Sequence, residues 1–297
     1  SSRAVPGFFV ISGFLIYMSY EKSDTLGNYY FKRFLRLAPA YVFLILACSI
    51  FLVLLSSNSA DQYFTVAWLR YIFYNLIFLN FLSPELPGVF SNNTIQAVNG
   101  PLWTLKIEVM FYIIVPILYK LVSKFSALPT MVLIFILSVV YVQIINYLHL
   151  ETGNQVFHRL SNQLPGQMMY FVSGILAYLY YEILKKNIRY FLVLAIGIFY
   201  FQIFSLDSIA LAVILVFLFI ILPYSLSFRK VGDMSYGVYI YHFPIIQILV
   251  SNKILADSPL ILMITTYLLT FTVSYLSWHA IEKRALKLKL RNLNTRK

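Results

Sequence analysis

Long apolar runs separated by short polar turns dominate this chain. A bilayer-spanning helix needs about 20 predominantly apolar residues, and the pattern predicts nine such spans, the first of them short. They cover residues 8–20, 37–56, 101–121, 127–148, 165–184, 188–205, 208–226, 233–252 and 258–280. We therefore predict an all-α fold, a polytopic transmembrane helical bundle in which short connections make neighbouring helices antiparallel.

Composition narrows the class further. Hydrophobic residues make up 60% of the 297 positions and charged residues 11%, whereas soluble domains carry roughly 45–50% and about 25%. These values exclude a soluble enzyme, a disordered chain and a disulfide scaffold. The single cysteine, Cys48, lies in an apolar run, and the four histidines form no HExxH motif, so we expect no metal site and one membrane-embedded domain over residues 1–297.

The stretch 64–82 is apolar enough to span but contains Arg70, Asn75 and Asn80. If it does not cross, 18 of the 23 lysines and arginines fall on one side, four on the other, and Lys106 lies in a helix. Such asymmetry marks the cytoplasmic side. We therefore expect 57–100 to be an external segment, with 64–82 re-entrant or interfacial, the loop 149–164 to be external too, and the basic tail 283–297 to be cytoplasmic. Because these basic residues sit in short turns between apolar runs, they indicate membrane orientation and lipid contact, not nucleic-acid binding.

A basic cluster lies where the second predicted span begins. Lys32, Arg33 and Arg36 occur in the segment 28–41, and Arg33 and Arg36 are three residues apart, so they share a helix face. Two guanidinium groups on one face suit a polyphosphate ligand. Simple anchoring of the helix at the cytoplasmic surface is the alternative.

Two further clusters put ionisable groups inside apolar helices, where each costs about 2.5–3.5 kcal/mol on insertion scales. Glu108 lies seven residues into the span that follows Asn99–Gly100–Pro101, with Trp103 at interface depth. His242 lies near the middle of its span, two residues before a proline, together with the hydroxyls of Ser235 and Tyr239. Glu108 has either a functional role or a structural ion pair; His242 is a hydrogen-bonding group of a polar cavity, a base, or a packing residue.

Two smaller features favour structural roles. Ser12 and Gly13 form a notch that allows another helix to approach closely. His279 and Glu282 are three residues apart at the end of the last span, and we expect them to pair on the surface.

Five of these segments, taken in order, resemble the integral-membrane acyltransferase 3 family, which O-acylates surface polysaccharides. They are PGFFVISGFLI at 6–16, YYFKRFLRLAPAY at 29–41, NGPLWTLKIEVMFYIIVP at 99–116, FVSGILAYL at 171–179 and VGDMSYGVYIYHFPI at 231–245. The IEK at 281–283 is similar to the family's closing Ile-Glu pattern, although Arg284 stands where the family often has proline. The family's bundle has ten helices, so the resemblance implies that a first helix, with its arginine and catalytic histidine, is missing before residue 1, and that the chain as given is crippled without that histidine.

The resemblance implies a membrane O-acyltransferase of the bacterial inner membrane, acting on exopolysaccharide, capsule, O-antigen or another glycan. Acetyl-CoA would be a co-substrate, with no bound cofactor. Arg33 and Arg36, with Lys32 beside them, would bind the acyl-CoA phosphates; Glu108, Trp103 and Tyr112 would line the bundle interior; and Ser235, Tyr239 and His242 would complete a polar path to the acceptor. Glu108 and His242 are the candidate catalytic residues.

Two other functions stay open at this point. A non-enzymatic transporter or flippase for a glycan or small acid would also place polar residues inside a bundle, although the chain shows no internal repeat of the kind transporters often have. A structural or partner-binding remnant is the third reading.

Overall fold

The computed structural model describes residues 4–201, 206–221, 233–252 and 258–294, and within these ranges the chain forms helices and turns with no strand. The chain divides into two compact units. Unit 1 comprises Ser1–Tyr29 and Ile107–Leu226, and unit 2 comprises Tyr30–Lys106 and Ser227–Lys297. Two helices, α2 and α5, cross the division, and each unit is described separately below.

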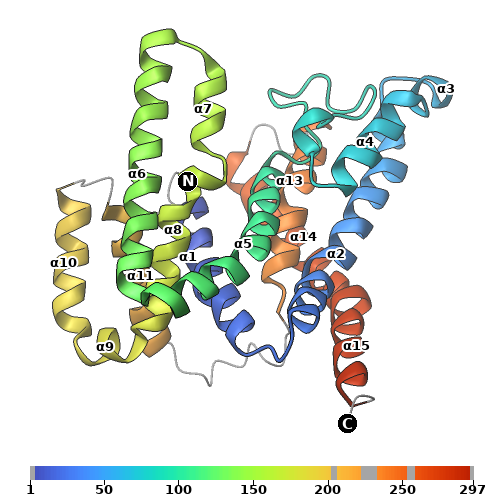
Figure 1. Cartoon of the computed structure of the whole chain (residues 1–297). Coiled ribbons are helices and arrows are strands. Elements are labelled where there is room, and N and C mark those ends of the chain that lie inside the picture. Colours follow the sequence, from blue (N-terminus) through green and yellow to red (C-terminus); the bar gives the residue numbers. More distant parts are fainter. Residues whose placement is uncertain (1–3, 202–205, 222–232, 253–257, 295–297) are drawn as a thin grey trace. The chain divides into compact units, whose positions relative to one another are not determined.

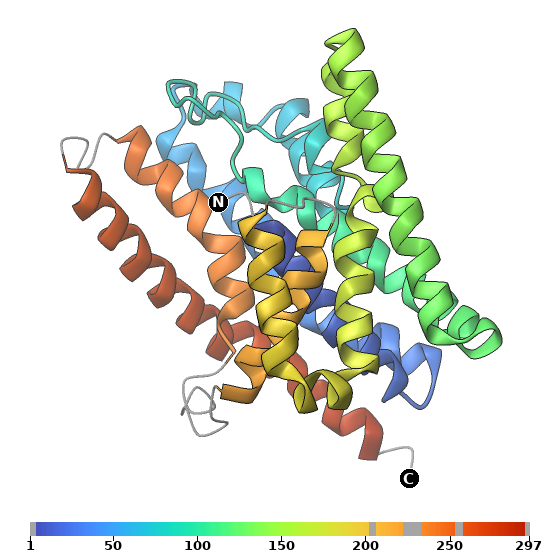
Figure 2. The same cartoon turned by 90° about the vertical axis from the view of Figure 1, so that its left-hand side faces the viewer.

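Unit 1 is built from apolar helices joined by short turns (Figure 1). They are α1 (Ala4–Glu21), most of α5 (Trp103–Phe125), α6 (Ala127–Thr152), α7 (Gln155–Ser161), α8 (Leu164–Leu179), α9 (Tyr181–Lys186), α10 (Ile188–Tyr200) and α11 (Asp207–Ile221). Helix α10 packs along α11, and α1 packs along α8 (Figure 2).

Glycines bring α1 and α8 into close contact. A Cβ added at Gly13 would overlap the backbone carbonyl of Phe171, and one added at Gly174 would overlap that of Val10. Close approach of this kind is how membrane helices gain van der Waals contact, because lipid provides no hydrophobic drive for helix association. The predicted notch at Gly13 is confirmed, and Gly174 is its counterpart on α8.

Pro116 in α5 explains the hydrogen bond that the buried Tyr29 hydroxyl makes. Pro116 has no N–H, so the carbonyl of Tyr112, four residues earlier, lacks its helical donor. The Tyr29 hydroxyl donates to that carbonyl at 3.1 Å. Phe111, the residue before Tyr112, stacks on Phe171 of α8 with ring centroids 3.8 Å apart.

The predicted loop 149–164 is partly helical. Gly153, at φ +64°, ends α6 in the left-handed conformation, and Asn154 caps α7 by accepting a hydrogen bond from the Val156 N–H at 2.9 Å. Glycine after one helix and asparagine before the next are the usual signals for these positions. The prediction of a plain loop was wrong because α7 has only seven residues, which is too short to show an apolar period.

Unit 2 contains the remaining helices. They are most of α2 (Leu26–Phe51), its 3-10 continuation η1 (Leu52–Leu55), α3 (Ala60–Tyr63), α4 (Val66–Leu76), η2 (Asn80–Leu82), η3 (Gly100–Leu102), the first turn of α5, α13 (Ser235–Ser251), α14 (Pro259–Ser277), the π-helical turn η5 (Trp278–Glu282) and α15 (Lys283–Asn294). Helix α13 packs along α14.

The segment between α2 and α5 does not contain a spanning helix. Helix α4 has 11 residues and rises about 16 Å, roughly half of the 30 Å hydrocarbon core. Side-chain bonds hold several parts of this segment. Trp68 and Tyr63 both donate to the Ser49 carbonyl, at 2.8 and 2.9 Å, and Gln247 donates to the carbonyls of Ile95 and Ala97. Irregular backbone in a membrane protein requires this kind of protein partner.

The helices confirm an all-α integral membrane fold. Four of them, within the described residues, are long and apolar enough to cross a bilayer: Ala4–Glu21, Leu26–Leu55, Ala127–Thr152 and Pro259–Leu288. Each other predicted span also coincides with a helix, though residues 202–205 and 222–226, at the ends of two spans, lie outside the described ranges. Helix α2 begins at Leu26, 11 residues before the predicted start at 37, because its first turns are helical but polar.

Candidate functional site

The start of α13 holds an ion pair with the predicted basic cluster. The Arg36 guanidinium on α2 lies 2.7 Å from the Asp233 carboxylate, and it donates to the Ser235 hydroxyl at 3.5 Å. Ser235 in turn donates to Asp233 at 2.6 Å. Two segments almost 200 residues apart in the chain therefore meet in unit 2, and they bring together Arg36 and Ser235.

This ion pair remains accessible to solvent. Arg36 is 27% exposed and Asp233 51% exposed, and pairs of such exposure contribute about 0–1 kcal/mol. An anionic ligand can therefore compete with Asp233 for the guanidinium at small energetic cost. Lys32 and Arg33, on the same helix, are half-buried.

One turn further along α13, Tyr239 fixes the beginning of α5. Its hydroxyl donates to the Pro101 carbonyl at 2.6 Å and also meets the hydroxyl of Thr104. Trp103, which is half-buried, directly precedes Thr104 in the chain. The start of α5, at Pro101 and Thr104, is thus adjacent to Tyr239 of α13.

A second hydrogen bond, between Asn99 and α13, is explained by Pro244. Pro244 removes the N–H that would pair with the carbonyl of Ile240, four residues earlier. The Asn99 side-chain amide donates to that carbonyl at 2.8 Å, and Asn99 is 5% exposed. The turn Asn99–Gly100–Pro101 is thereby anchored to the kink of α13.

His242 is oriented by its own helix. Its Nδ1 lies 2.7 Å from the carbonyl of Tyr239 and 3.2 Å from that of Val238. Because carbonyl oxygens only accept, we assign the proton to Nδ1, which leaves Nε2 as the nitrogen with the lone pair. A half-buried imidazole held in this tautomer can accept a proton from a hydroxyl.

Three of the predicted site residues share one face of α13. Ser235, Tyr239 and His242 are at positions i, i+4 and i+7 of a continuous helix, which places them in line over two turns, about 10 Å along the axis. This line runs from the cationic Arg36 pair to the imidazole. It offers an anion-binding group at one end and a proton acceptor at the other.

Glu108 and Tyr112 form a separate pair in unit 1. The Tyr112 hydroxyl donates to the Glu108 carboxylate at 2.5 Å, one helical turn away on α5. Tyr112 is 6% exposed, and both its hydroxyl and its backbone carbonyl are hydrogen-bonded. Glu108 is half-buried and points its charge toward a phenol, an arrangement that suits proton exchange as well as packing.

Glu282 lies close to the residues of α13, a placement that the sequence did not predict. The expected surface pair with His279 is wrong: Glu282 is 2% exposed, and its carboxylate accepts from Ser277, whose hydroxyl meets that of Tyr241 on α13 at 3.0 Å. His279 instead bonds to the Tyr275 carbonyl at 2.9 Å. The cause is the π turn Trp278–Glu282, which has more residues per turn than an α-helix and rotates Glu282 inward.

The charges around Glu282 connect it to the Arg36 cluster. Arg36 and Asp233 are the charged groups that act on it electrostatically. Within the described ranges no donor reaches the second carboxylate oxygen of Glu282, and no group of three or more His, Cys, Asp or Glu side chains is placed to hold a metal. The unit 2 cluster therefore combines a guanidinium, two carboxylates, hydroxyls and an imidazole.

The family model and the related proteins that match this chain point to the same family. The model of the acyltransferase 3 family, described as an acyltransferase domain, matches residues 1–279. An O-acetyl transferase of Shigella phage Sf6 is 28% identical over 291 residues, which are 95% of this chain and 84% of the relative. Nodulation protein 10 of Rhizobium leguminosarum bv. viciae is 25% identical, over 97% of this chain and 83% of its own length.

A longer relative matches as well. The O-acetyltransferase OatA of Staphylococcus aureus is 26% identical over 94% of this chain, which aligns with 51% of that protein. No solved structure matches. This chain belongs to the acyltransferase 3 family, and it is an integral membrane acyltransferase that transfers groups other than aminoacyl groups.

Proposed function

We propose that this protein transfers an acetyl group from cytoplasmic acyl-CoA to a hydroxyl of a cell-surface or exported polysaccharide, or of its lipid-linked precursor, in the bacterial inner membrane. The observation that carries the proposal is the face of α13 that joins the Arg36 ion pair to His242 through Ser235 and Tyr239. The names of two relatives as O-acetyl transferases support acetyl as the group and oxygen as the acceptor atom.

The donor half of the proposal rests on the basic residues of α2. Arg36 is partly exposed and its ion pair with Asp233 is weak, so a phosphate of CoA exchanges with Asp233 as its partner. Lys32 and Arg33 add positive charge within one turn. Since these residues lie where α2 emerges from its apolar run, the nucleotide part of CoA stays in water on the cytoplasmic side while its pantetheine arm enters the protein.

The acceptor half requires a base. His242, with its proton on Nδ1, takes the proton of the acceptor hydroxyl on Nε2 as the oxygen attacks the thioester carbonyl. A C–O bond forms, the C–S bond breaks, and the histidine returns its proton to the departing CoA thiolate, so the products are the O-acetyl ester and CoA-SH. General-base help of this kind is worth about 10²–10⁴-fold in rate, and Glu108 is the second group that could supply it.

Transfer of label in membrane vesicles tests the proposal. Inverted vesicles from cells expressing the complete gene receive acetyl-CoA labelled in the acetyl group, with membranes lacking the protein as the blank. Alkali-labile label on polysaccharide is then counted. We expect label that depends on the protein and is reduced about 100-fold or more by His242→Gln.

A matched variant separates catalysis from structure. His279 is half-buried like His242 and also bonds a backbone carbonyl four residues earlier through Nδ1, but it lies in the π turn Trp278–Glu282, away from the line on α13. His279→Gln should therefore retain wild-type transfer. Absence of label with the protein present and its native acceptor supplied would refute acetyl transfer, whereas full activity of His242→Gln would refute this residue as the base.

A further inference from the structure

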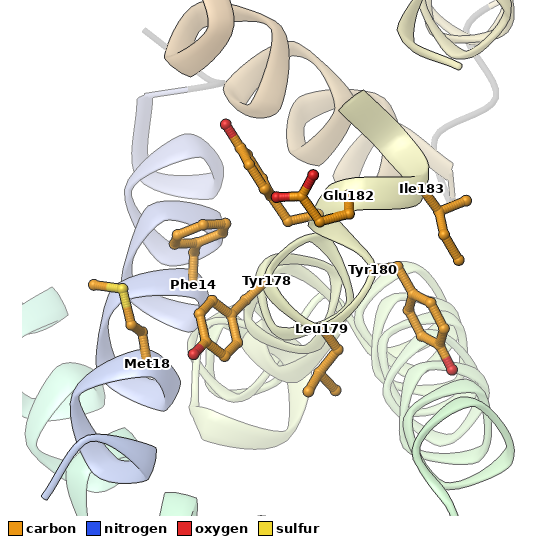
Figure 3. Close-up of a pocket in the computed structure, with 8 residues that line it drawn as sticks. Phe14, Met18, Tyr178, Leu179, Tyr180, Glu182 and Ile183 are labelled. Carbon is orange, nitrogen blue, oxygen red and sulfur yellow. The ribbon is translucent and has the colours of Figure 1, made fainter. Parts of the chain in front are cut away.

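A pocket lined by aromatic rings lies in unit 1, where α1 ends and α8 passes into α9. Its volume is about 410 Å³, and Phe14, Tyr178 and Tyr181 supply the rings. The Phe14 ring meets those of Tyr178 and Tyr181 edge-on, with centroids 5.3 and 6.2 Å apart. Figure 3 shows Phe14 beside Tyr178, and Met18 one turn further along α1. Aromatic rings attract a cation that approaches their π system.

Two carboxylates add negative charge to the pocket. Glu182, on the first turn of α9, lines it directly and is exposed to solvent; it lies above the Phe14 and Tyr178 rings in Figure 3. Glu21, at the end of α1, accepts a hydrogen bond from the Tyr178 hydroxyl. A cation in the pocket would therefore meet ring faces and carboxylate charge together.

Positive charge is available immediately beside the pocket. Lys185 and Lys186 follow Glu182 by three and four residues, so they lie on the same side of α9, and both are exposed. A ligand that carries an ammonium group and, a few atoms away, a phosphate matches this order of charges. A ligand with a phosphate alone would gain the lysines but would face the carboxylates.

The position of the pocket relates it to the membrane surface. Helix α9 is a six-residue connection between the apolar helices α8 and α10, and α1, a candidate span, ends at Glu21. These ends lie where apolar helices leave the bilayer, which is the depth of lipid headgroups. Tyrosine is typical of this depth because its ring is apolar and its hydroxyl is polar.

We propose that this pocket binds the headgroup of a zwitterionic glycerophospholipid of the phosphatidylethanolamine type. The ammonium group lies among Phe14, Tyr178 and Tyr181 against the carboxylate of Glu182, and the phosphate lies near Lys185 and Lys186. The acyl chains remain in the bilayer. The site is independent of acyl transfer, and its binding can be measured without an activity assay.

Native mass spectrometry of the delipidated full-length protein in detergent tests this site. Dioleoyl phosphatidylethanolamine and dioleoyl phosphatidylglycerol are added in equal amounts, and the retained lipid is counted per protein. We expect preferential retention of phosphatidylethanolamine. Glu182→Gln should lower its affinity about threefold to fivefold, as expected for loss of an exposed charge contact, and Tyr181→Leu should lower it similarly by removing a ring.

Matched controls keep the proposal falsifiable. Glu151→Gln removes an exposed carboxylate of the same unit outside the pocket and should bind as wild type. Because Glu182 is exposed, its variant should fold normally, which the chromatographic profile checks. Equal retention of both lipids, or equal binding by wild type and Glu182→Gln, would overturn the proposal.

Discussion

Replacing Asn99 by alanine should destabilise the protein, and the size of the effect should depend on Pro244. The Asn99 amide donates to the Ile240 carbonyl, which has no helical donor because Pro244 lacks an N–H. Removing the amide leaves this carbonyl buried without its donor. The same removal in a Pro244→Ala protein should matter much less, because alanine restores the helical N–H.

The expected magnitude follows from the burial of the site. Asn99 is 5% exposed and the bond is 2.8 Å long, and an orphaned buried acceptor costs about 1–3 kcal/mol. Within the described residues the side-chain oxygen of Asn99 receives no hydrogen bond. Removing this buried oxygen is favourable, and this offsets part of the cost of losing the amide donor. We therefore expect Asn99→Ala to cost about 1–2 kcal/mol with Pro244 present, and at least about 1 kcal/mol less in the Pro244→Ala background.

Equilibrium unfolding in detergent measures this coupling. The four proteins of the cycle are wild type, Asn99→Ala, Pro244→Ala and the double variant, and their free energies of unfolding are compared. Asn93→Ala supplies the control: Asn93 lies in the same loop and donates to Gln247 of the same helix, at 3.1 Å to its carbonyl, but that carbonyl is unrelated to the proline. Its cost should be the same with either residue at 244. An equal cost of Asn99→Ala in both backgrounds would refute the reasoning.

Three other predictions concern transfer and packing. Arg33→Ala combined with Arg36→Ala should raise the KM for acetyl-CoA about tenfold or more, as measured by initial rates in vesicles, with normal protein levels; an unchanged KM would exclude these residues from the donor site. Glu108→Gln should lower the rate at saturating acetyl-CoA about 100-fold, and wild-type turnover would leave Glu108 a structural residue. Gly174→Ala should destabilise by about 1–3 kcal/mol in the same unfolding assay, because its Cβ would overlap a carbonyl of α1. Gly197→Ala, whose Cβ meets no atom within 4 Å, should not.

The sequence predicted the spans because the bilayer constrains them so strongly. Every backbone polar group must be bonded internally in lipid, so a long apolar run is almost always a helix. Hydropathy is blind to helical residues that are polar, and for this reason the start of α2 at Leu26 and the helix α7 were not predicted. The prediction that 64–82 does not cross the membrane rested on the distribution of lysines and arginines, not on hydropathy. The helix formed there, α4, is indeed too short to cross.

Only some residues of the candidate site could be predicted from the sequence. Arg36, Ser235 and His242 stand out because ionisable and polar groups are rare in this chain, and the structure joins Arg36 to Ser235 through Asp233. Glu282 did not stand out, because its inward direction depends on a π turn that no local pattern specifies. The roles of these residues in transfer stay predictions until the variants are measured.

At two of the three prolines that lie inside described helices, Pro116 and Pro244 but not Pro39, a polar side chain from elsewhere in the chain bonds the carbonyl that the proline frees. Proline in a membrane helix frees one carbonyl, and lipid offers it no donor, so the fold must supply one. At Pro116 the donor is the hydroxyl of Tyr29, and at Pro244 it is the amide of Asn99. In each case a residue far away in the chain is fixed against the kink: Tyr29 at the start of the basic segment 29–41, and Asn99 at the turn that begins α5. The kinks therefore hold the polar segments of each unit in register, and this accounts for charged and hydroxyl side chains collecting beside them without any strand, metal or disulfide among the described residues.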